Sequence, residues 1–338
     1  MKNSRTSSTR CPDRRRFFLL LVLLLAAAAA LSLCLGAEAV NIPEAVRDLL
    51  RGENSAGANI LRYARLPRTC AALLAGGALA SAGVIIQGVL ANSLAAPSTI
   101  GVNAGAGLAV TVLCAAVPGA TASAPAAALL GAFGGAMLVL TIARRTGASR
   151  ISLVLAGVAV SAIFSAGIDA VVTFVPDALA GYSDFRIGGL FNVPMRRLLP
   201  AALLIVPAFL TALSLRNELD LLVLGTEQAR SLGLPARRLQ IIFLGLAAVL
   251  AGSAISFAGL IGFVGLIVPH AMRRLVGEES GPLLLGSALG GALLLCGCDL
   301  ISRLLFAPYE LPVGIVMALV GGPFFLWLLR RRGGTVRD

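Results

Sequence analysis

Long apolar runs separated by short polar breaks recur along almost the whole chain. A helix needs about 20 apolar residues to cross the roughly 30 Å hydrocarbon core of a bilayer. The pattern therefore predicts an all-α membrane protein of about ten transmembrane helices, near residues 17–37, 66–88, 95–114, 121–143, 151–175, 197–215, 239–258, 260–276, 281–303 and 311–329. The run at 260–276 is short and rich in glycine and proline, so a broken helix is the alternative there.

Composition and charge agree with a chain that lies in lipid. Hydrophobic residues make up 58% of the sequence and charged residues 13%, against about 25% charged residues in soluble domains. A net charge of +12 would point to nucleic acid in a soluble protein, but here the basic residues lie in the breaks between apolar runs. Few aromatic residues accompany them, so there is no stacking platform for bases and we expect no nucleic acid partner. The cysteines are scattered, and we expect small buried side chains and no metal site.

The basic residues are distributed unevenly between the two ends of the predicted helices. If the N-terminus lies inside, the inner segments hold 19 of the 28 lysine and arginine residues. The outer segments hold the other nine, together with acidic residues that include Glu38, Glu44, Asp48, Glu53, Asp177 and Asp184. The positive-inside rule then places both termini in the cytoplasm, with the chain as a multi-pass protein of the bacterial plasma (inner) membrane. This organisation predicts the following parts: cytoplasmic tails at 1–16 and 331–338, one transmembrane domain at 17–330 and a cytoplasmic loop at 216–238.

The first apolar run has a second interpretation. Arg14, Arg15 and Arg16 precede it and residues 37–39 read Ala-Glu-Ala, as in a secretory signal with its cleavage site. The run is longer than the usual core of a signal, and more apolar runs follow it. We therefore expect an uncleaved first transmembrane helix.

Two of the apolar segments resemble each other. Residues 74–85 match residues 250–261 at seven positions. In the ten-span arrangement these segments cross the membrane in opposite directions, as in the inverted repeats of transporters. Chance similarity is the alternative, because helices rich in alanine and glycine are common where helices pack tightly in lipid.

Several classes of protein lack the residues that they need. Lys2 is the only lysine and lies in the polar N-terminal tail, so a phosphate-binding loop of the form GxxxxGK[ST] is impossible. If ATP drives transport, another polypeptide must hydrolyse it. His270 is the only histidine, and Asp169, Asp299 and Glu310 are the acids expected at membrane depth, which argues against a proton-coupled carrier or a bare-cation channel. No nucleophile has a neighbouring base, so we expect no enzyme.

The C-terminal third carries the most specific motifs. Residues 262–270 read Gly-Phe-Val-Gly-Leu-Ile-Val-Pro-His and are followed by Arg273. The residues of these motifs are Gly265, Pro269 and His270, then Asp299 and Arg303 as D-x-x-x-R, Glu310, Pro312 and Gly314 as E-x-P-x-G, and Gly321, Pro323 and Phe325 as G-x-P-x-F. With further matches upstream, the chain resembles the permease family of ABC importers for iron-siderophores, haem and cobalamin, the FecCD type, over about residues 60–330.

The resemblance implies a cobalamin-permease-like fold and a set of partners. Two permeases, either a homodimer of this chain or this chain with a paralogue, would enclose one path through the lipid. Two copies of an ATP-binding subunit would use ATP on the cytoplasmic side, an extracytoplasmic substrate-binding protein would deliver the cargo, and this chain would bind no cofactor.

The cargo is inferred from the sparse charge at membrane depth. A bare cation would need polar ligands in place of its water, so a wrapped metal chelate suits this chain better. The resemblance makes a ferric siderophore the first expectation, with cobalamin and haem as alternatives. A secondary carrier driven by an ion gradient is the alternative of a different class, and a membrane scaffold without transport is a third.

The resemblance also assigns roles on the two sides of the membrane. The cytoplasmic loop mixes leucines with charged residues and ends at Gly233 and Pro235. The expected ATPase coupling residues are Leu224, Gly225, Ala229, Arg230, Leu232 and Gly233; a helix resting on the membrane surface is the alternative. On the outer side, Arg65, Arg68 and Arg303 would receive acidic side chains of the binding protein. An Asp299–Arg303 ion pair and simple interface anchoring are the alternatives.

The gate and path residues follow from the same resemblance. Asn92 and Leu94 correspond to a cytoplasmic gate, but Ser93 stands where the family has proline and Ala91 where it has a larger polar residue, so a plain loop cap is the alternative. Asp169 either lines the path or caps a break before Pro176. His270 is expected to be a packed or capping imidazole. The loop at 277–280 departs from the family's aspartate-histidine pair, and no role is assigned there.

Overall fold

The computed structural model describes residues 14–36, 38–120, 122–145, 150–307 and 309–333, and over these residues every regular element is a helix. The long helices are α1 (Arg14–Cys34), α4 (Leu66–Leu90), α6 (Ala124–Arg145), α7 (Arg150–Phe174), α9 (Met195–Ser214), α12 (Ala236–Ala258), α14 (Ser280–Leu304) and α15 (Val313–Gly333). The shorter ones are α2 (Ile42–Arg51), α3 (Ala56–Asn59), a π-helical turn η1 (Ile60–Arg65), a 3-10 turn η2 (Pro97–Ile100), α5 (Val102–Ala116), α8 (Ala178–Ile187), α10 (Arg216–Leu224), α11 (Thr226–Ser231) and α13 (Val264–Val276).

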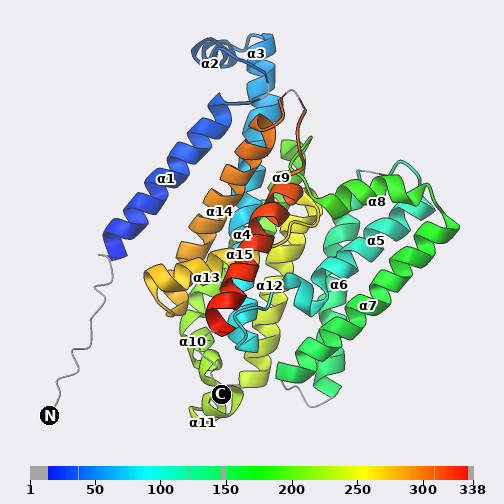
Figure 1. Ribbon diagram of the computed structural model, residues 1–338, viewed down its shortest axis with the longest axis vertical. Coiled ribbons are helices and arrows are strands. Elements are labelled where there is room, and N and C mark those ends of the chain that lie inside the picture. The colour runs from blue at the N-terminus through cyan, green and yellow to red at the C-terminus, as the bar shows by residue number, and fades with distance from the viewer. Residues whose placement is uncertain (1–13, 37, 121, 146–149, 308, 334–338) are drawn as a thin grey trace.

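Figure 1 shows the long helices as a bundle with short helices at both ends. The end that carries α2 and α3 is called the outer end, and the end that carries α10 and α11 the inner end, after the orientation predicted from the charges. Helix α2 begins at the outer end with Pro43 and Glu44 in its first turn and stops at Gly52, which takes a left-handed conformation. Proline and an acidic residue suit the start of a helix, and glycine suits its end. The apolar pattern did not predict α2, α3 or α8, because none of them crosses the bundle.

The ten predicted runs each contain a helix, but not each helix is long enough to cross a membrane. The segments that are long and apolar enough are seven: Arg14–Cys34, Ala56–Leu90, Ala124–Arg145, Arg150–Phe174, Met195–Ser214, Ala236–Ala258 and Ser280–Leu304. The runs at 95–114 and 311–329 hold shorter apolar helices, Val102–Ala116 and Val313–Leu328. The run at 260–276 holds α13, which begins only at Val264 and has 13 residues. A continuous eighth span is therefore wrong, and the broken-helix alternative is confirmed.

The break before α13 is stabilised by contacts with a distant part of the chain. Gly259 ends α12 at φ 70° and ψ −164°, a conformation that favours glycine. The Leu260 N–H donates to the Phe185 carbonyl at 2.9 Å, and the Gly189 N–H donates to the Ala258 carbonyl at 2.9 Å. These bonds satisfy backbone groups that a continuous helix would satisfy internally, so the chain can leave the helix inside the protein.

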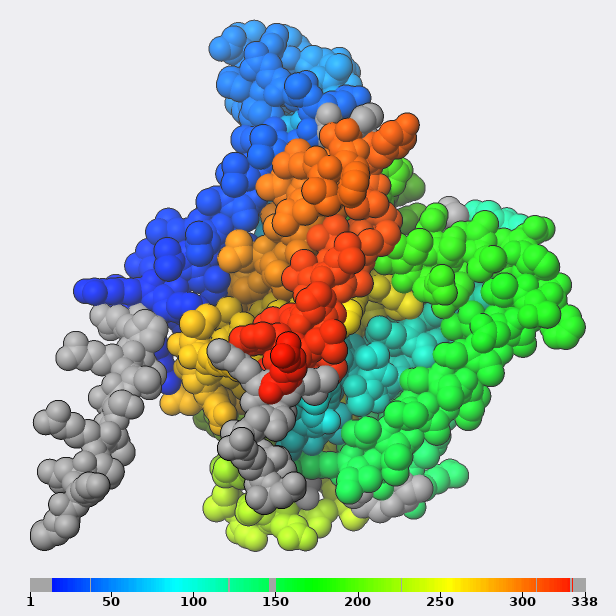
Figure 2. Space-filling model, in the orientation of Figure 1, coloured from blue at the N-terminus to red at the C-terminus, as the bar shows by residue number. Residues whose placement is uncertain are grey.

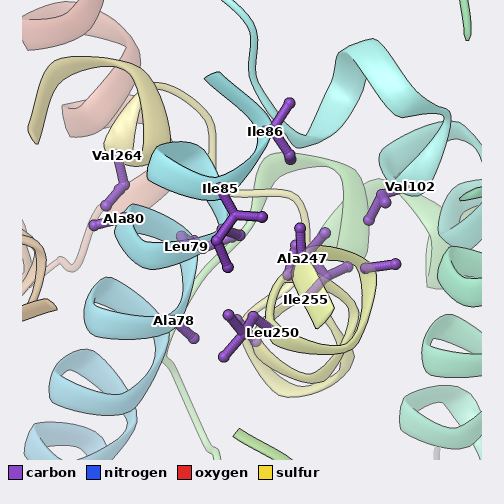
Figure 3. Close-up of a cluster of buried hydrophobic side chains, with 14 of the residues drawn as sticks. Ala78, Leu79, Ala80, Ile85, Ile86, Val102, Ala247, Leu250, Ile255 and Val264 are labelled. Carbon is purple, nitrogen blue, oxygen red and sulfur yellow. The ribbon is translucent and has the colours of Figure 1, made fainter. Parts of the chain in front are cut away.

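Helix α4 lies at the centre of the bundle, with α12, α13 and α14 packed around it. Small residues allow backbones to touch: a Cβ added at Gly76 would lie 2.2 Å from the Gly291 carbonyl oxygen of α14. Figure 3 shows the larger side chains filling the space between α4 and α12, among them Leu79, Ile85 and Leu250. Tight packing of small residues is the usual basis of helix association in lipid.

The two similar segments of the sequence lie in this core. Residues 74–85 belong to α4, and residues 250–258 form the last part of α12. The two helices pack side by side and run in opposite directions (Figure 1). The prediction that these two segments cross in opposite directions is therefore confirmed.

Candidate functional site

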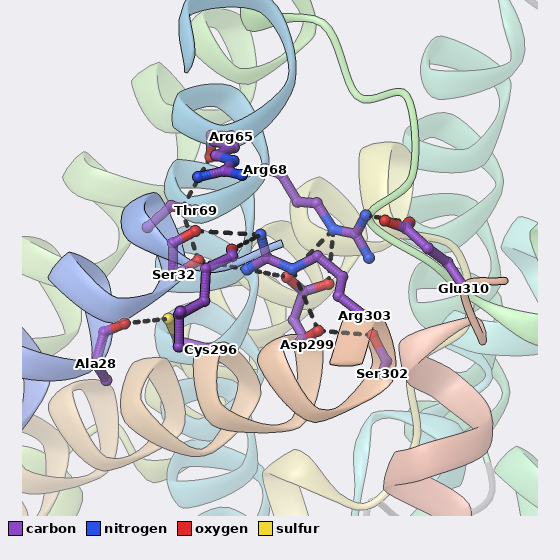
Figure 4. A network of polar contacts seen from close by, with 11 residues as sticks. Ala28, Ser32, Arg65, Arg68, Thr69, Cys296, Asp299, Ser302, Arg303 and Glu310 are labelled. Atoms are coloured by element: carbon purple, nitrogen blue, oxygen red, sulfur yellow. Dashed lines mark hydrogen bonds and ion pairs between the residues drawn. The ribbon is translucent and has the colours of Figure 1, made fainter. Parts of the chain in front are cut away.

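A network of charged side chains ties the outer ends of α4 and α14 to the loop before α15 (Figure 4). Arg68 Nε donates to Asp299 Oδ1 at 2.9 Å, and its Nη1 donates to Glu310 Oε2. Arg303 Nη2 forms an ion pair with Asp299 Oδ2 at 3.1 Å. Asp299 is 0% exposed and Arg303 2% exposed. The buried carboxylate thus has two guanidinium partners, as a charge out of water requires.

Two arginines hold the C-terminal end of α1. Arg65 donates to the carbonyls of Leu33, Cys34 and Glu38 at 2.9, 2.7 and 2.6 Å. Arg303 donates to the Ser32 carbonyl at 3.1 Å and also to the Ser32 hydroxyl. The last carbonyls of a helix have no partner within it, and a cation there also interacts favourably with the helix dipole. Arg65 and Arg303 therefore fasten the otherwise loosely packed α1 to the bundle.

These contacts bear on the expected docking arginines. The Asp299–Arg303 ion pair, given above as an alternative, is confirmed. Arg65 is 4% exposed, so both it and Arg303 are buried and fully engaged inside the chain. Docking stays a prediction for Arg65, Arg68 and Arg303, and for the two buried residues it would require internal bonds to be given up.

A cavity of about 910 Å³ opens beside this network at the outer end. Arg68, Arg197, Glu38, Asp184 and Glu310 contribute charge of both signs to its lining. Its apolar walls come from the end of α8, the α8–α9 connection, the end of α12 and the start of α15, with the following side chains: Phe185, Ile187, Leu190, Phe191, Phe257 and Val313. The cavity is therefore large, and its lining carries positive and negative side chains together, so no single sign of charge dominates it.

The E-x-P-x-G motif shapes this cavity. Gly314 packs so closely on α8 that a Cβ there would lie 1.9 Å from the Ile187 carbonyl oxygen, and its N–H donates to the Gly188 carbonyl at 3.1 Å. Pro312 directly precedes the first residue of α15. Glycine and proline at these positions let α15 begin directly against α8, with Glu310 directed toward Arg68.

The motif around α13 forms a second polar contact inside the bundle. Gln87 of α4 donates from Nε2 to the Gly265 carbonyl at 3.0 Å and accepts from Arg273 Nη1. Phe263 starts α13 at φ 66°, a left-handed conformation that is unusual for a large residue. Its ring packs on Gly321, where a Cβ would lie 2.2 Å from the ring. The GFVGLIVPH and G-x-P-x-F motifs are thus joined in space.

His270 belongs to the same contact. Its ring lies edge-to-face against Phe324 of α15, with ring centroids 6.2 Å apart. The expected packed imidazole is therefore confirmed. Pro269 lies within α13, just before this histidine.

At the inner end, the predicted cytoplasmic loop folds as α10 and α11 (Figure 1). Leu219 and Leu222 are buried, and Leu219 packs on Gly88 of α4. Asp220 accepts from the Ser280 N–H at 2.8 Å at the start of α14. Arg150 donates to the Leu222 carbonyl at 3.0 Å at the end of α10. The helix pair is thus fastened to three long helices.

The six expected coupling residues divide into two kinds. Leu224 and Leu232 are each 62% exposed, and Arg230 is exposed between them in sequence. Ala229 is buried, Gly225 joins the helices at φ 134° and ψ 152°, and Gly233 ends α11 at φ 82°. The conformation of Gly225 is essentially restricted to glycine. We define the coupling surface as Leu224, Arg230 and Leu232; Gly225, Ala229 and Gly233 set the geometry that presents it.

The expected gate residues lie directly after α4. Ala91 ends α4 in a left-handed conformation, at φ 44° and ψ 40°. The Leu94 N–H donates to Asn92 Oδ1 at 3.0 Å, and the Asn92 N–H donates to the Gln87 carbonyl at 3.1 Å. This is the loop cap given above as the alternative. A gate formed by Asn92 and Leu94 stays a prediction.

Replacing Ala91 with glycine is expected to stabilise the chain by about 0.5–1 kcal/mol, because glycine adopts the left-handed conformation without a steric penalty. The apparent unfolding temperature of the full chain in detergent measures the effect. Ala91→Val is the matched substitution and is expected to shift that temperature in the opposite direction. Equal shifts for both variants would contradict the assigned conformation.

Asp169 lies on the exposed side of α7, which continues without interruption to Phe174. Its side chain makes no hydrogen bond to the described residues, so it caps no break before Pro176. Burial raises the pKa of the Tyr182 phenol of α8, Arg186 lowers it, and the Asp169 carboxylate raises it again, which places Asp169 near that tyrosine. Its role in lining a path stays a prediction.

Two partners in these networks carried no signal in the sequence. Ser32 is fully buried, and its hydroxyl shares a 2.7 Å hydrogen bond with that of Thr69. Arg150 looked like one more basic residue at an inner helix end. A single serine within an apolar run and an arginine at the end of another apolar run are both common in membrane helices. Only the packing therefore reveals what Ser32 and Arg150 bond to.

The chain is similar to known transport proteins over nearly its whole length. The model of a family described as the FecCD transport family matches residues 23–331. The chain is 39% identical to the Fe(3+)-citrate import system permease protein YfmE of Bacillus subtilis, with 89% of this chain and 90% of that protein covered. It is 38% identical to the hemin transport system permease protein HmuU of Yersinia pestis, with 79% and 82% covered. A solved structure described as an inward-facing conformation of a metal-chelate type ABC transporter matches with a TM-score of 0.84 and 28% identity, over 94% of this chain and 99% of that one.

Proposed function

Because the chain belongs to the FecCD transport family, we propose that it is the membrane-spanning permease of an ATP-driven importer whose cargo is a ferric chelate of the siderophore class. It lies in the bacterial inner membrane with both termini in the cytoplasm. Two copies of a separate ATP-binding subunit supply the energy, and this chain carries no ATPase site and no cofactor of its own. An extracytoplasmic binding protein delivers the cargo at the outer end.

The observation that carries this proposal is the coupling surface. Leu224, Arg230 and Leu232 are exposed at the inner end, at the end of α10, within α11 and directly after α11, while Leu219, Leu222 and Ala229 are buried against the bundle. Exposed leucines beside a charged residue suit a protein interface, whose core is apolar and whose rim is polar. A force applied to α10 reaches α4 through Leu219 and α14 through Asp220. Movement of the ATP-binding subunits would thereby act on helices that reach the outer end.

The second permease copy is proposed to cover the face seen in Figure 2. There the surface is recessed between α15 and α7, with residues of α5 and α6 at its floor. On α7, Ile151, Leu155, Val158 and Ile163 are exposed. A second copy of this chain, or a paralogous permease, would enclose the recess and form a mostly apolar path.

The cargo follows from the outer cavity and from the relatives. A cavity of about 910 Å³ with mixed charge suits a bulky chelate whose metal is already wrapped. A bare cation would need a cluster of ligands, and the described residues hold no group of three or more His, Cys, Asp or Glu side chains that could bind a metal. The Fe(3+)-citrate relative favours a ferric chelate, and the similar identity to the hemin relative makes hemin the second candidate.

The test reconstitutes the chain with its ATP-binding subunit and binding protein in proteoliposomes and measures ATP-dependent uptake of labelled ferric chelates and of hemin. Charging the coupling surface with L224D/L232D is expected to lower uptake at least about tenfold, because residues at the centre of an interface carry most of its energy. Leu50→Asp is the matched control, since Leu50 is 83% exposed on the outer α2. Uptake without the ATP-binding subunit, abolished by an ionophore, would instead establish a secondary carrier. Unchanged uptake by the double variant would contradict the coupling role.

A further inference from the structure

A second cavity, of about 310 Å³, lies at the inner end between α6, α7 and α12. It lies at the opposite end of the bundle from the outer cavity. Neither the coupling surface nor the outer cavity includes any of its lining residues. Its lining combines arginines at the ends of α6 and α12 with apolar side chains deeper in the bundle. A cavity with a charged mouth and an apolar floor at the predicted lipid headgroup level is a candidate binding site.

The mouth of this cavity is strongly basic. Arg144, Arg237 and Arg238 line it, and no acidic residue does. All three arginines are exposed. Within the described part of the chain, none of them has an ion-pair partner. Guanidinium groups bind phosphate oxygens through paired hydrogen bonds, so three of them around one space favour a phosphorylated anion.

A buried amide provides the independent observation. Gln240 is 5% exposed and lines the cavity. The described residues offer its side-chain amide no hydrogen-bond partner. Buried residues usually have their polar groups hydrogen-bonded, and this amide is accessible only from the cavity, so it is placed to bond a polar ligand there. Its NH₂ group donates, as a phosphate oxygen requires.

The apolar part of the cavity distinguishes between possible ligands. Leu140, Leu153 and Leu244 form its inner walls and are buried. On the outside of α12, Ile242 is exposed toward the predicted lipid. A soluble phosphate would leave these apolar walls uncovered, whereas the glycerol and acyl chains of a lipid would cover them.

We propose that this cavity binds the phosphate headgroup of an anionic phospholipid of the inner leaflet, with Arg144, Arg237, Arg238 and Gln240 as its ligands. Basic pockets between transmembrane helices on the cytoplasmic side are suited to such headgroups. The proposal rests on the proposed function only for the orientation of the chain. It predicts a lipid bound at a defined place, in addition to the general attraction between basic residues and an anionic surface.

The test titrates the purified full chain in mild detergent with phosphatidylglycerol and measures bound lipid by native mass spectrometry. R237Q/R238Q is expected to weaken binding about 25-fold, since one arginine near an anionic lipid surface contributes about fivefold. Gln240→Leu, of similar volume, is expected to weaken it severalfold. Phosphatidylcholine and soluble glycerol phosphate serve as the other probes and are expected to bind more weakly than phosphatidylglycerol.

Arg145→Gln is the matched control, because Arg145 is exposed at the same helix end but does not line the cavity. It is expected to leave the affinity within about twofold of the unaltered chain, because Arg145 does not line the cavity and the detergent provides no anionic surface. An equal loss for Arg145→Gln and Arg144→Gln would overturn the proposal in favour of diffuse surface charge.

Equal affinity for soluble glycerol phosphate and for phosphatidylglycerol would also overturn the proposal. So would R237Q/R238Q chains that keep their lipid but lose the ATP-binding subunit, since the arginines would then serve protein docking. If the glutamine variants misfold, R237K/R238K keeps the charge but loses the paired hydrogen bonds and is expected to bind the lipid more weakly than the unaltered chain; unchanged binding would favour diffuse surface charge. None of these measurements involves transport, so failure here is distinct from failure of the proposed function.

Discussion

Replacing Asp299 with alanine is expected to lower the free energy of unfolding by about 3–5 kcal/mol, the usual cost of removing one partner from a buried ion pair. Arg68 and Arg303 both bond to this carboxylate, and Arg303 is as inaccessible to water as Asp299 itself. Without Asp299, the Arg303 guanidinium would remain buried and lose its counter-ion. The effect is measured as the loss of monodisperse full-length chain on heating in detergent.

Asp184→Ala is the matched control for this prediction. Asp184 lines the same outer cavity, but it is exposed. Its replacement is expected to change stability by less than about 0.5 kcal/mol, as for most surface positions. An Asp299→Ala chain as stable as the unaltered one would show that the network is not needed for folding. Reduced affinity for the binding protein at unchanged stability would then favour the docking role of Arg68.

Replacing Gly83 with valine is expected to cost about 3 kcal/mol or more and to reduce the yield of folded chain sharply. A Cβ at this position would lie 2.0 Å from the Gly265 carbonyl oxygen, and valine adds two further methyl groups. The obstacle is the backbone of α13, which cannot turn away as a side chain can. Overpacking of a core usually costs about 1–3 kcal/mol, and a backbone obstacle places this site at or above that range. Folded yield and unfolding temperature in detergent are the measurements.

Gly245→Ala is the control for the glycine prediction. Gly245 lies inside α12, and an added Cβ there would meet no atom within 4 Å. Alanine is the better helix former by about 0.5–1 kcal/mol, so this variant is expected to be as stable as the unaltered chain or more stable. If Gly83→Val folds normally, α4 and α13 do not touch as described.

The positions of the main apolar helices could be predicted from the sequence, because an apolar run is a local property. The ten runs all contain helices, and the antiparallel placement of the two similar segments also followed from counting them. The short helices at the outer end could not be found in this way. Helix α8 is stabilised by what it touches, such as the close approach of Ile187 to Gly314, and hydropathy carries no record of that contact.

The motif residues show where a sequence pattern stops being informative. Gly265, Pro269, His270, Asp299, Glu310 and Pro312 were recognised, but for Gly265, His270, Asp299 and Glu310 the reason lies in a partner far away in the chain. His270 packs against Phe324, the Gly265 carbonyl accepts from Gln87, and Glu310 accepts from Arg68. The coupling residues are a similar case, since only the packing separates exposed Leu224 and Leu232 from buried Ala229.

The sequence was sufficient to identify a membrane chain with many apolar helices, and it predicts that any ATP-derived energy comes from another polypeptide. These conclusions depend on composition, on run lengths and on the presence of one lysine, and none of them requires knowledge of a contact. The inward direction of Arg65 and Arg303, which hold α1, and the late start of α13 became visible only in the packed fold. The direction of a charged side chain and the end of a helix inside a protein depend on which distant groups can satisfy their hydrogen bonds, and folding alone brings those groups together.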